Sequence, residues 1–281
     1  MGSTSRIIEA RHCRSAALAA LAASAFAAGA RADISRPNFS NTAGLNVVQN
    51  STIMGNELRL TSAVGSQVGG AWEDAKQRVS LGFTTTFQFK ITNIGGGWDG
   101  TLSGGGDGFA FVIQNSGNLG PEFAGALTGG GLGFNGMSNA LAIEFDTWKN
   151  DRAQDLDANH ISILTNGTDV LTPEQIYSIG YTSAIPDMSD GNVHTVKIDY
   201  VPGLMKVYLD NMVTPAVTGA VNLSSKLSLD AGKAWVGFTA ATGGAWENHD
   251  IMSWSMTTVP SPGSAVLMAA GVVTAGLRRR R

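Results

Sequence analysis

Between residues 33 and 258 the sequence alternates short β-prone runs with turn residues and has no segment of convincing helical period. Runs that alternate apolar and polar side chains, separated by Gly, Asn, Asp and Pro, are typical of half-buried strands. Many short strands bury their apolar faces by packing against a second sheet or by closing into a barrel, so the series predicts an all-β sandwich or barrel. The predicted strands cover residues 57–64, 83–91, 108–114, 141–148, 160–165, 194–201, 204–210, 234–242 and 251–257.

Two local patterns refine the organisation of this region. The segment DYVPGLMKVYLD predicts a hairpin with Pro202-Gly203 at its turn, because Pro presets φ and Gly accepts a positive φ. Gly-rich segments at 95–106 and 129–136 lie between predicted strands and are predicted to be loops. We find no internal repeat of fixed period, so we expect one β domain rather than an array.

The first 32 residues differ from this pattern. Arg6, Arg11 and Arg14 precede the apolar run SAALAALAASAFAAGA, which closes with Ala30-Arg31-Ala32. A basic start, a short apolar middle and a small-x-small exit are typical of a secretory signal peptide. We therefore expect residues 1–32 to be cleaved off after Ala32, the alternative being an ordinary Ala-rich helix.

Residues 259–281 combine Pro260 and Pro262, an apolar or small stretch over 263–277, and four final arginines. A helix of about fifteen residues reaches roughly 22 Å, short of the roughly 30 Å hydrocarbon core, so it is a weak permanent span. This arrangement resembles the bacterial PEP-CTERM sorting tail, although Ser261 stands where that family usually has Glu. The resemblance implies transient membrane association and removal of the tail during export. A plain C-terminal anchor is the alternative.

The region left between the two ends, 33–258, is long enough for one domain with a large core. Of the chain's 19 basic and 22 acidic residues, four Arg and one Glu lie in 1–32 and four Arg in the tail. The mature region therefore keeps 11 basic and 21 acidic residues, a net charge of −10, which argues against nucleic acid or an anionic membrane as its partner. The only cysteine is Cys13, so the mature region has no disulfide.

The stretch LAIEFDTWKNDRAQDLDANHISI, residues 141–163, gathers acids and one histidine between two predicted strands. Residues two apart on a strand point to the same side, so Glu144 and Asp146 should share a face about 6.5 Å apart. Two carboxylates so close to a sandwich core are costly unless they are neutralised. Carboxylates with an amide and a carbonyl suit Ca²⁺, and carboxylates with an imidazole suit a transition ion such as Mn²⁺. The alternative is a solvated acidic turn with a capping histidine.

The spacing of these residues resembles a known metal loop. EFDTWKN is followed by Asp155, nine residues after Asp146, and by His160 five residues later, as in the legume-type (L-type) lectins. Three further stretches are similar to that family, in its order: GGGDGFAFVIQN (104–115), TGGGLGF (128–134) and VGFTAATGGAWENHDIMSWSM (236–256). The resemblance spans nearly all of 33–258 and implies a concanavalin A-like jelly-roll β-sandwich.

The same resemblance implies two neighbouring ions. A transition-metal ion, expected to be Mn²⁺, would be held by Glu144, Asp146, Asp155 and His160. A Ca²⁺ ion would be held by Asp146, the carbonyl oxygen of Trp148, Asn150 and Asp155. Asp151 and Asp157 have no counterpart in the family and are interpreted as solvated loop charges.

A sugar needs a fixed carboxylate to accept from its hydroxyls, an amide to donate back, and an aromatic ring for its C–H face. The resemblance assigns these three roles to Asp107, Asn150 and Trp148. It adds backbone N–H groups from Gly130 or Gly131 and from Gly244–Ala245. For Asp107 the alternative is a turn residue after glycines.

The resemblance also implies a cis peptide bond, which would be Gly106–Asp107. Two features depart from the family: the chain lacks the aromatic residue that many members insert after the glycines, and the loop at 243–247 reads GGAWE. Trp246 in that loop is expected either to stack on a sugar or to pack inward. His194 and His249 lie within or beside strands and are given no role.

Two other functions compete with sugar binding. Related jelly-roll glucanases carry Glu-x-Asp-x-x-Glu on one strand, as a nucleophile and an acid/base. Here Lys149 holds the last position, so Glu144 has no acid/base partner on its strand. The second alternative is a structural matrix protein with a vestigial sugar site.

The sequence therefore predicts a secreted or surface-associated, non-catalytic, metal-dependent lectin of a Gram-negative-type bacterium. Its expected partners are glycans or exopolysaccharide, and the resemblance also allows a homodimer formed through the sheets.

Overall fold

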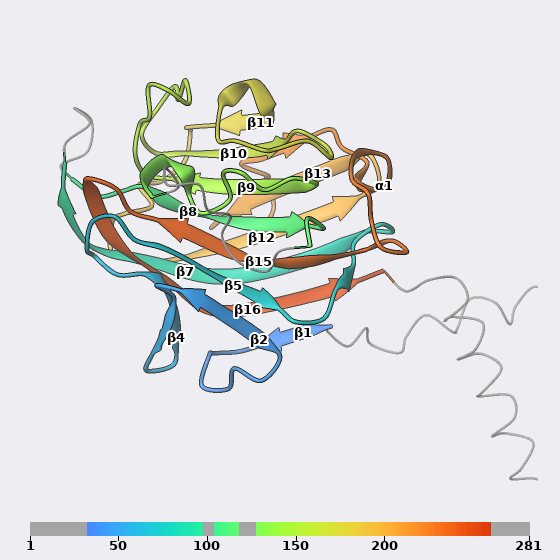
Figure 1. Cartoon of the computed structure of the whole chain (residues 1–281), viewed down its shortest axis with the longest axis horizontal. Coiled ribbons are helices and arrows are strands. Elements are labelled where there is room, and N and C mark those ends of the chain that lie inside the picture. Colours follow the sequence, from blue (N-terminus) through green and yellow to red (C-terminus); the bar gives the residue numbers. More distant parts are fainter. Residues whose placement is uncertain (1–32, 98–103, 118–127, 260–281) are drawn as a thin grey trace, which may run out of the picture. The chain divides into compact units, whose positions relative to one another are not determined.

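The computed structural model describes residues 33–97, 104–117 and 128–259, and the strands in these ranges form two antiparallel sheets (Figure 1). The back sheet runs in the order β14 (Val217–Gly219), β13 (Leu204–Leu209), β12 (Val193–Val201), β7 (Phe83–Gly96), β16 (Ala245–Thr258), β4 (Glu57–Thr61) and β3 (Thr52–Met54), with β1 (Ile34–Arg36) paired to β16. The front sheet runs β11 (Ser178–Thr182), β10 (His160–Thr165), β9 (Ala140–Asp146), β8 (Gly108–Gln114), β15 (Lys233–Ala241), β5 (Val68–Glu73) and β2 (Leu45–Gln49), with β6 (Gln77–Arg78) paired to β15. The prediction of an all-β sandwich is confirmed.

Helices in the described ranges are short connectors. They are η1 (Gly129–Gly131), η2 (Gln175–Tyr177) and α1 (Leu223–Lys226). In α1 the Asn222 side chain caps the first turn by accepting from the backbone N–H of Ser224. None of them is long or apolar enough to cross a membrane. The predicted signal peptide (1–32) and all but the first residue of the predicted tail (259–281) lie outside the described residues.

All nine predicted strands are present, and two agree with the prediction at both ends, namely β8 and β10. The Pro202-Gly203 hairpin is also confirmed, because Val201 pairs with Leu204 across the turn between β12 and β13. The sequence patterns missed the short strands β1, β2, β3, β6, β11 and β14. They also missed β5, whose sequence VGGAWE contains two glycines, which weaken strand propensity.

The largest difference concerns β7 and β16. The Gly-rich segment from residue 95 was predicted to be a loop, yet β7 continues to Gly96, and β16 begins at Ala245 rather than at 251. The two strands pair along their whole length, from Phe83 opposite Thr258 to Gly96 opposite Ala245. Backbone pairing with a long neighbour therefore extends both strands through sequence that has little strand propensity of its own.

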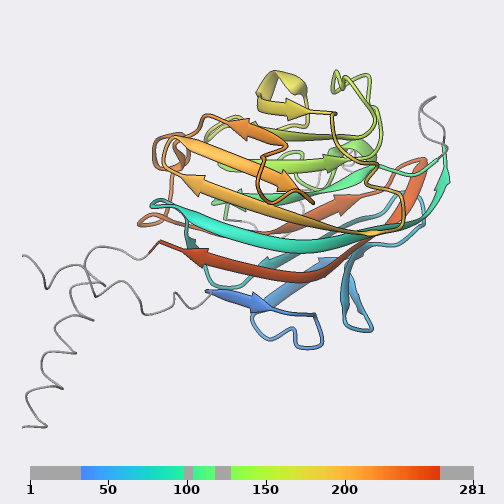
Figure 2. The ribbon, with the colours of Figure 1, turned by 180° about the vertical axis from the view of Figure 1, so that it is seen from behind.

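Figure 2 shows the ribbon of the two sheets from behind. Aromatic side chains fill the space between these sheets. Phe87 of the back-sheet strand β7 packs edge-on against Phe145 of β9 and Phe238 of β15, with ring centroids 5.7 and 5.0 Å away. On the front sheet Phe109 stacks on Phe145 at 4.8 Å, and the two residues are paired across β8 and β9. All four side chains are fully buried.

This packing determines which side chains face away from the core. Because alternate residues of a strand point to opposite sides, an inward Phe145 places Glu144 and Asp146 on the outer face of the front sheet. That face is itself covered over much of its area by a second apolar cluster, to which Trp72, Leu132, Phe134, Met137 and Leu171 belong. The two outward acids are also buried, at 1% and 2% exposure.

We predict that replacing Phe87 with Ala lowers the free energy of unfolding by about 3–5 kcal/mol, because it removes the ring that contacts both sheets and leaves a cavity. Urea unfolding followed by tryptophan fluorescence measures the change. Val213→Ala is the control, because Val213 is 88% exposed and its loss should change stability little. A cost below about 1 kcal/mol for Phe87→Ala would contradict the described core.

Candidate metal and carbohydrate site

Strands β9 and β10 and the loop between them carry the predicted transition-metal ligands at one end of the front sheet. His160 pairs directly with Asp146, and Ser162 pairs with Glu144, so all these side chains lie on the outer face. His160 Nε2 lies 3.3 Å from Glu144 Oε1, and its Nδ1 lies 2.8 Å from the carbonyl oxygen of Asp157. The carbonyl accepts only if Nδ1 carries the proton, which leaves Nε2 available as a ligand atom.

The loop after β9 folds its polar groups back over the same end. The backbone N–H of Asn150 donates to Asp155 Oδ2 at 2.7 Å, and the N–H of Trp148 donates to Asp146 Oδ1 at 2.8 Å. The Asn150 amide donates to the carbonyl oxygen of Trp148 at 3.3 Å. Hydrogen bonds thus connect all the residues predicted to bind Ca²⁺, although these residues lie up to nine positions apart in the sequence.

The acids at this site are buried without a lysine or arginine partner among the described residues. Burial raises the pKa of Glu144 to about 7, although its contacts with His160 oppose the shift. Burial and then the charge of Asp155 raise the pKa of Asp146 well above its usual range. Burial lowers the pKa of His160, but its hydrogen bond with Glu144, the charges of Glu144 and Asp155 and its contact with Asp157 together outweigh burial, so the net pKa is raised. Three carboxylates and one imidazole therefore share a site with excess negative charge.

The donor set fits a divalent cation. Glu144 Oε2 is buried without a hydrogen-bond partner in the described part of the chain, and an orphaned buried carboxylate oxygen is costly unless an ion or a water satisfies it. As the side chains stand, no group of three or more His, Cys, Asp or Glu residues in the described ranges converges on a single ion position. Binding would therefore require side-chain rotations within this site.

Asp107 lies beside this cluster, at the start of β8. The peptide bond Gly106–Asp107 is cis, as predicted. The carboxylate is 4% exposed, and its Oδ2 has no hydrogen-bond partner among the residues described. Burial raises the pKa of Asp107 to about 7, although hydrogen bonds with Asn150 and Gly243 oppose the shift. Oδ2 of Asp107 is therefore a buried hydrogen-bond acceptor that has no donor among the described residues.

Glycines surround the Asp107 and Asn150 side chains. A Cβ at Gly243 would lie 3.0 Å from Asp107 Oδ2, and one at Gly129 would lie 3.4 Å from Oδ1. A Cβ at Gly130 would lie only 2.3 Å from Asn150 Oδ1, so a larger residue there would displace the amide. The Gly-rich loop thus allows the backbone to approach both polar side chains closely, which is a reason for Gly at these positions.

The two tryptophans of the site lie on glycine backbone. Trp148 packs over Gly106 and Gly97, where a Cβ would lie 3.2 and 3.1 Å from its side chain. Trp246 packs on Gly95 and Gly96 at the end of β7, with corresponding distances of 2.6 and 2.8 Å. Both tryptophans keep intermediate exposure. Trp246 was expected either to stack on a sugar or to pack inward. One face of its ring packs inward, on Gly95 and Gly96.

Of the remaining predicted sugar-binding positions, one is exposed and two are buried. Gly244 is exposed, and no atom lies within 4 Å of a Cβ placed on it. Ala245 is buried at 3% exposure and packs against Gly106. Gly131 is buried within η1. The structure thus brings Asp107, Gly130, Trp148, Asn150 and Ala245 together, while Gly244 lies on the edge and Gly131 behind it.

Sequence reasoning missed several residues of the site. Gln175 of η2 approaches Glu144, with Nε2 3.5 Å from Oε1, and its backbone N–H donates to the carbonyl oxygen of Ala153. Glu247 is fully buried and contacts the Thr147 hydroxyl. The signal for Glu247 was present, because it and His249 are two ionisable residues in the closing strand, but their partners come from distant segments.

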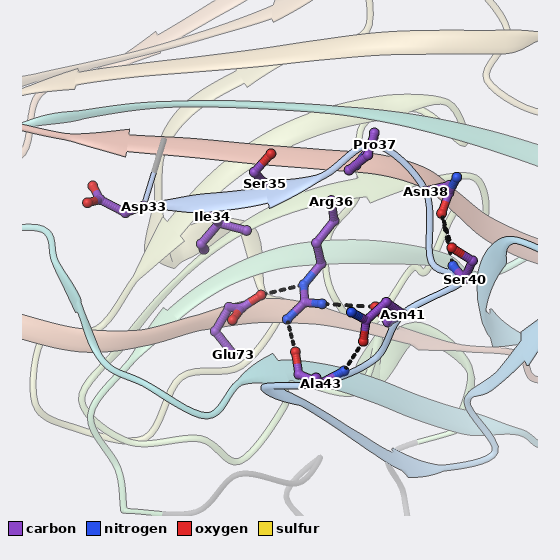
Figure 3. Close-up of a pocket in the computed structure, with 10 residues that line it drawn as sticks. All are labelled: Asp33, Ile34, Ser35, Arg36, Pro37, Asn38, Ser40, Asn41, Ala43 and Glu73. Carbon is purple, nitrogen blue, oxygen red and sulfur yellow. Dashed lines mark hydrogen bonds and ion pairs between the residues drawn. The ribbon is translucent and has the colours of Figure 1, made fainter. Parts of the chain in front are cut away.

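A cavity of about 350 Å³ lies elsewhere, around β1 (Figure 3). Arg36 crosses it with its donors engaged: Nε contacts Glu73 Oε1 at 2.5 Å, and Nη1 and Nη2 donate to the carbonyl oxygens of Asn41 and Ala43. β1 pairs with Trp254–Met256, at the opposite end of β16 from Ala245. We interpret this cavity as part of the support of the N-terminal loop, not as the functional site.

Comparison with known proteins decides the family. The family profile described as the legume lectin beta-barrel domain matches residues 34–254. The chain belongs to this family. Its two sheets are accordingly the jelly-roll β-sandwich of a legume-type lectin domain, as the resemblance implied.

Individual relatives agree with this assignment. The lectin domain is 28% identical over 212 residues to the L-type lectin-domain containing receptor kinase VII.1 of Arabidopsis thaliana, covering 70% of this chain and 28% of the kinase. It is 29% identical over 205 residues to the seed lectin of Styphnolobium japonicum, covering 68% and 62% of the two chains. The chain thus spans less than two thirds of the length of either relative. A structure of the winged bean acidic lectin complexed with methyl-α-D-galactose superposes with a TM-score of 0.62 at 26% identity, covering 80% of this chain and 96% of that one.

We predict that Glu144→Gln stabilises the lectin domain in EDTA at pH 8 by roughly 1–3 kcal/mol, because each unit of raised pKa reflects about 1.4 kcal/mol of penalty on the buried charge. Thermal and urea unfolding measure the change. Asp151→Asn is the matched control, because Asp151 is exposed and should change nothing. Loss of stability in Glu144→Gln would show that another group already compensates the carboxylate.

Proposed function

We propose that this protein is a secreted or surface-associated, metal-dependent, non-catalytic carbohydrate-binding protein. The observation that carries the proposal is the meeting of Asp107, Asn150 and Trp148 beside buried carboxylates that have no lysine or arginine partner in the described ranges. A carboxylate, an amide and an aromatic ring are the groups that a sugar ring requires. A legume-type lectin domain holding this combination supports a lectin more directly than either alternative.

Two ions would complete the site. Glu144, Asp146, Asp155 and His160 would hold a transition-metal ion, expected to be Mn²⁺, because carboxylates with one imidazole suit it. Asp146, the Trp148 carbonyl, Asn150 and Asp155 would hold Ca²⁺, which takes oxygen ligands. When bound, the ions supply positive charge that neutralises the buried acids and fixes the loop.

The residues that touch the sugar act as a preformed frame. Asp107 accepts from sugar hydroxyls through its unpartnered oxygen, and Asn150 donates its amide from above Gly130. The Trp148 ring takes the apolar face of the sugar, and its seat on two glycines keeps it from rotating away. The galactoside in the winged bean lectin structure supports a hexopyranoside as the ligand class.

Burial supports a non-catalytic role. Glu144 and Asp146 are nearly inaccessible, and Lys149, which replaces the second glucanase acid, is exposed on the loop. A glycosidase acid must reach the leaving oxygen of its substrate, and its partner carboxylate must stand on the opposite side of the bond. Neither buried acid meets this requirement without the sheet opening.

The export proposal rests on the sequence. The mature protein would begin at Asp33, associate with the membrane through its tail, lose that tail and remain at the cell surface, where exopolysaccharide is a ligand within reach. Mass spectrometry of the protein from the outer surface of its host tests this. A C-terminus upstream of residue 263 supports tail removal, and an intact Arg281 supports the plain anchor instead.

Metal binding should stabilise the protein. Because ions bind the folded state, Ca²⁺ and Mn²⁺ at about 100 times their Kd should add about 2.7 kcal/mol of stability per site. Calorimetric unfolding with ions and then with EDTA measures the shift, and a glycan array under both conditions measures sugar binding. Absence of any shift would refute the metal site, and a shift without array signals would refute the sugar site alone.

The carboxylate of Asp107 should be required for sugar binding but not for metal binding. We predict that Asp107→Asn weakens glycan affinity at least about tenfold, because the amide presents a donor where an acceptor is needed. The metal-induced stabilisation should remain. Asp169→Asn, at an exposed loop position, is the control. Undiminished glycan binding by Asp107→Asn would place the sugar elsewhere.

A further inference from the structure

Glu247, in β16, is fully buried directly beneath the candidate site, and neither the metal nor the sugar proposal uses it. Its Oε1 accepts from the Thr147 hydroxyl and lies 3.1 Å from His249 Nε2. Its Oε2 accepts from the Ser189 hydroxyl at 2.9 Å. Two segments remote in sequence, which carry Thr147 and Ser189, and the neighbouring His249 of the same strand thus converge on one carboxylate.

The Thr147 contact reaches both halves of the site. Thr147 lies between Asp146 and Trp148, so its side chain fixes the chain where metal ligands and sugar platform meet. Its backbone N–H donates to the carbonyl oxygen of Asp107 at 2.9 Å. Any movement of Thr147 would therefore displace the proposed sugar carboxylate as well as the metal strand.

A second route leads to the same carboxylate through the Gly-rich turn before Asp107. A Cβ at Gly105 would lie 2.7 Å from Glu247 Oε2, so the turn rests directly on the carboxylate. The N–H of Gly105 also donates to the carbonyl oxygen of Gly95 at 3.0 Å. The chain that leads into the cis bond is therefore supported from below by Glu247.

The Ser189 contact reaches the far end of the metal loop. The loop that carries Ser189 is tied to Asn159: the amide of Asn159 donates to the carbonyl oxygen of Pro186 at 2.8 Å, and the N–H of Met188 donates to Asn159 Oδ1 at 3.1 Å. Asn159 immediately precedes His160. Glu247 therefore connects the two ends of the loop that would wrap the ions.

His249 completes the support from the opposite side. Its Nδ1 lies 2.6 Å from the Thr61 hydroxyl, and both residues are fully buried. With Nε2 protonated, the imidazole donates to Glu247 while its Nδ1 accepts from Thr61. Among the described residues His249 is the one basic side chain in contact with Glu247, so the carboxylate is held by directed hydrogen bonds and not by a flexible cation.

We propose that Glu247 is a positioning residue that sets the spacing between the metal loop and the Asp107 turn, through Thr147, Gly105 and Ser189. This inference rests on the proposed function for its consequence, the affinity for ions and sugar. Its structural content, the ordering of two site segments by one buried carboxylate, can be tested without any ligand.

The test compares isosteric variants in the exported protein. Glu247→Gln weakens all the hydrogen bonds that Glu247 accepts. Thr147→Val and Ser189→Ala each remove one donor to its carboxylate. Asp250→Asn and Thr85→Val are the matched controls: Asp250 is a buried acid on the same strand, paired with Arg59 at 2.7 Å, and Thr85 is a buried threonine that accepts from Trp254 in the core. Both controls lose buried polar contacts away from the site.

The primary measurement is hydrogen exchange in EDTA over residues 104–110 and 144–150. We expect faster exchange in these two segments for Glu247→Gln and Thr147→Val, and no local change there for the controls. The second measurement is Ca²⁺ affinity by titration calorimetry, which should fall about tenfold or more in the site variants, as for other residues that orient ligands indirectly.

The outcomes separate this inference from the proposed function. If the wild-type protein binds neither Ca²⁺ nor glycan, the proposed function fails, and exchange still decides whether Glu247 orders the two segments. If the site variants only lower the melting temperature, as the controls do, with exchange and Ca²⁺ affinity unchanged, Glu247 is an ordinary buried acid and the inference is overturned. Should Glu247→Gln not fold, Thr147→Val and Ser189→Ala decide the matter.

Discussion

The structure depends on the aromatic packing between its two sheets. Phe87 of the back sheet contacts the rings of Phe145 and Phe238, and Phe109 stacks on Phe145. These contacts fix which side of β8 and β9 faces inward, because a strand shifted by one residue would exchange its faces. The same parity places Glu144 and Asp146 outward on neighbouring positions. The hydrophobic core thus determines where the charged groups must lie, and the site follows from the core's register.

Placing acids on a covered face creates an electrostatic problem. Buried carboxylates that outnumber their basic partners are unstable as charges, and the raised pKa values of Glu144, Asp146 and Asp155 have burial as their first cause. A globular protein usually avoids such a cluster. Its presence in a legume-type lectin domain is understandable if cations occupy it, since their positive charge would then offset the cost of the buried carboxylates.

Much of this was predictable because it is local. Strand alternation predicted the shared face of Glu144 and Asp146, and the Pro-Gly pair predicted the hairpin. The cis bond before Asp107 was implied by the resemblance to the legume-type lectins. The extension of β7 through Gly95 and Gly96 was not predictable, because those residues form a strand only through pairing with β16. The seats of Trp148 and Trp246 on glycines, likewise, depend on segments more than forty residues apart in the chain.

The resemblance to the legume-type lectins supplied the candidate residues for ions and sugar. The sequence by itself determined the β class and which side chains share a face on strands such as β9. It did so because these properties depend on residue type and on separations of a few positions. Only the tertiary structure decided that Glu247 lies beneath the site with Thr147, Ser189 and His249 around it. The physical reason is that a buried carboxylate takes its partners from whatever segments the fold places next to it, and no local pattern specifies those segments.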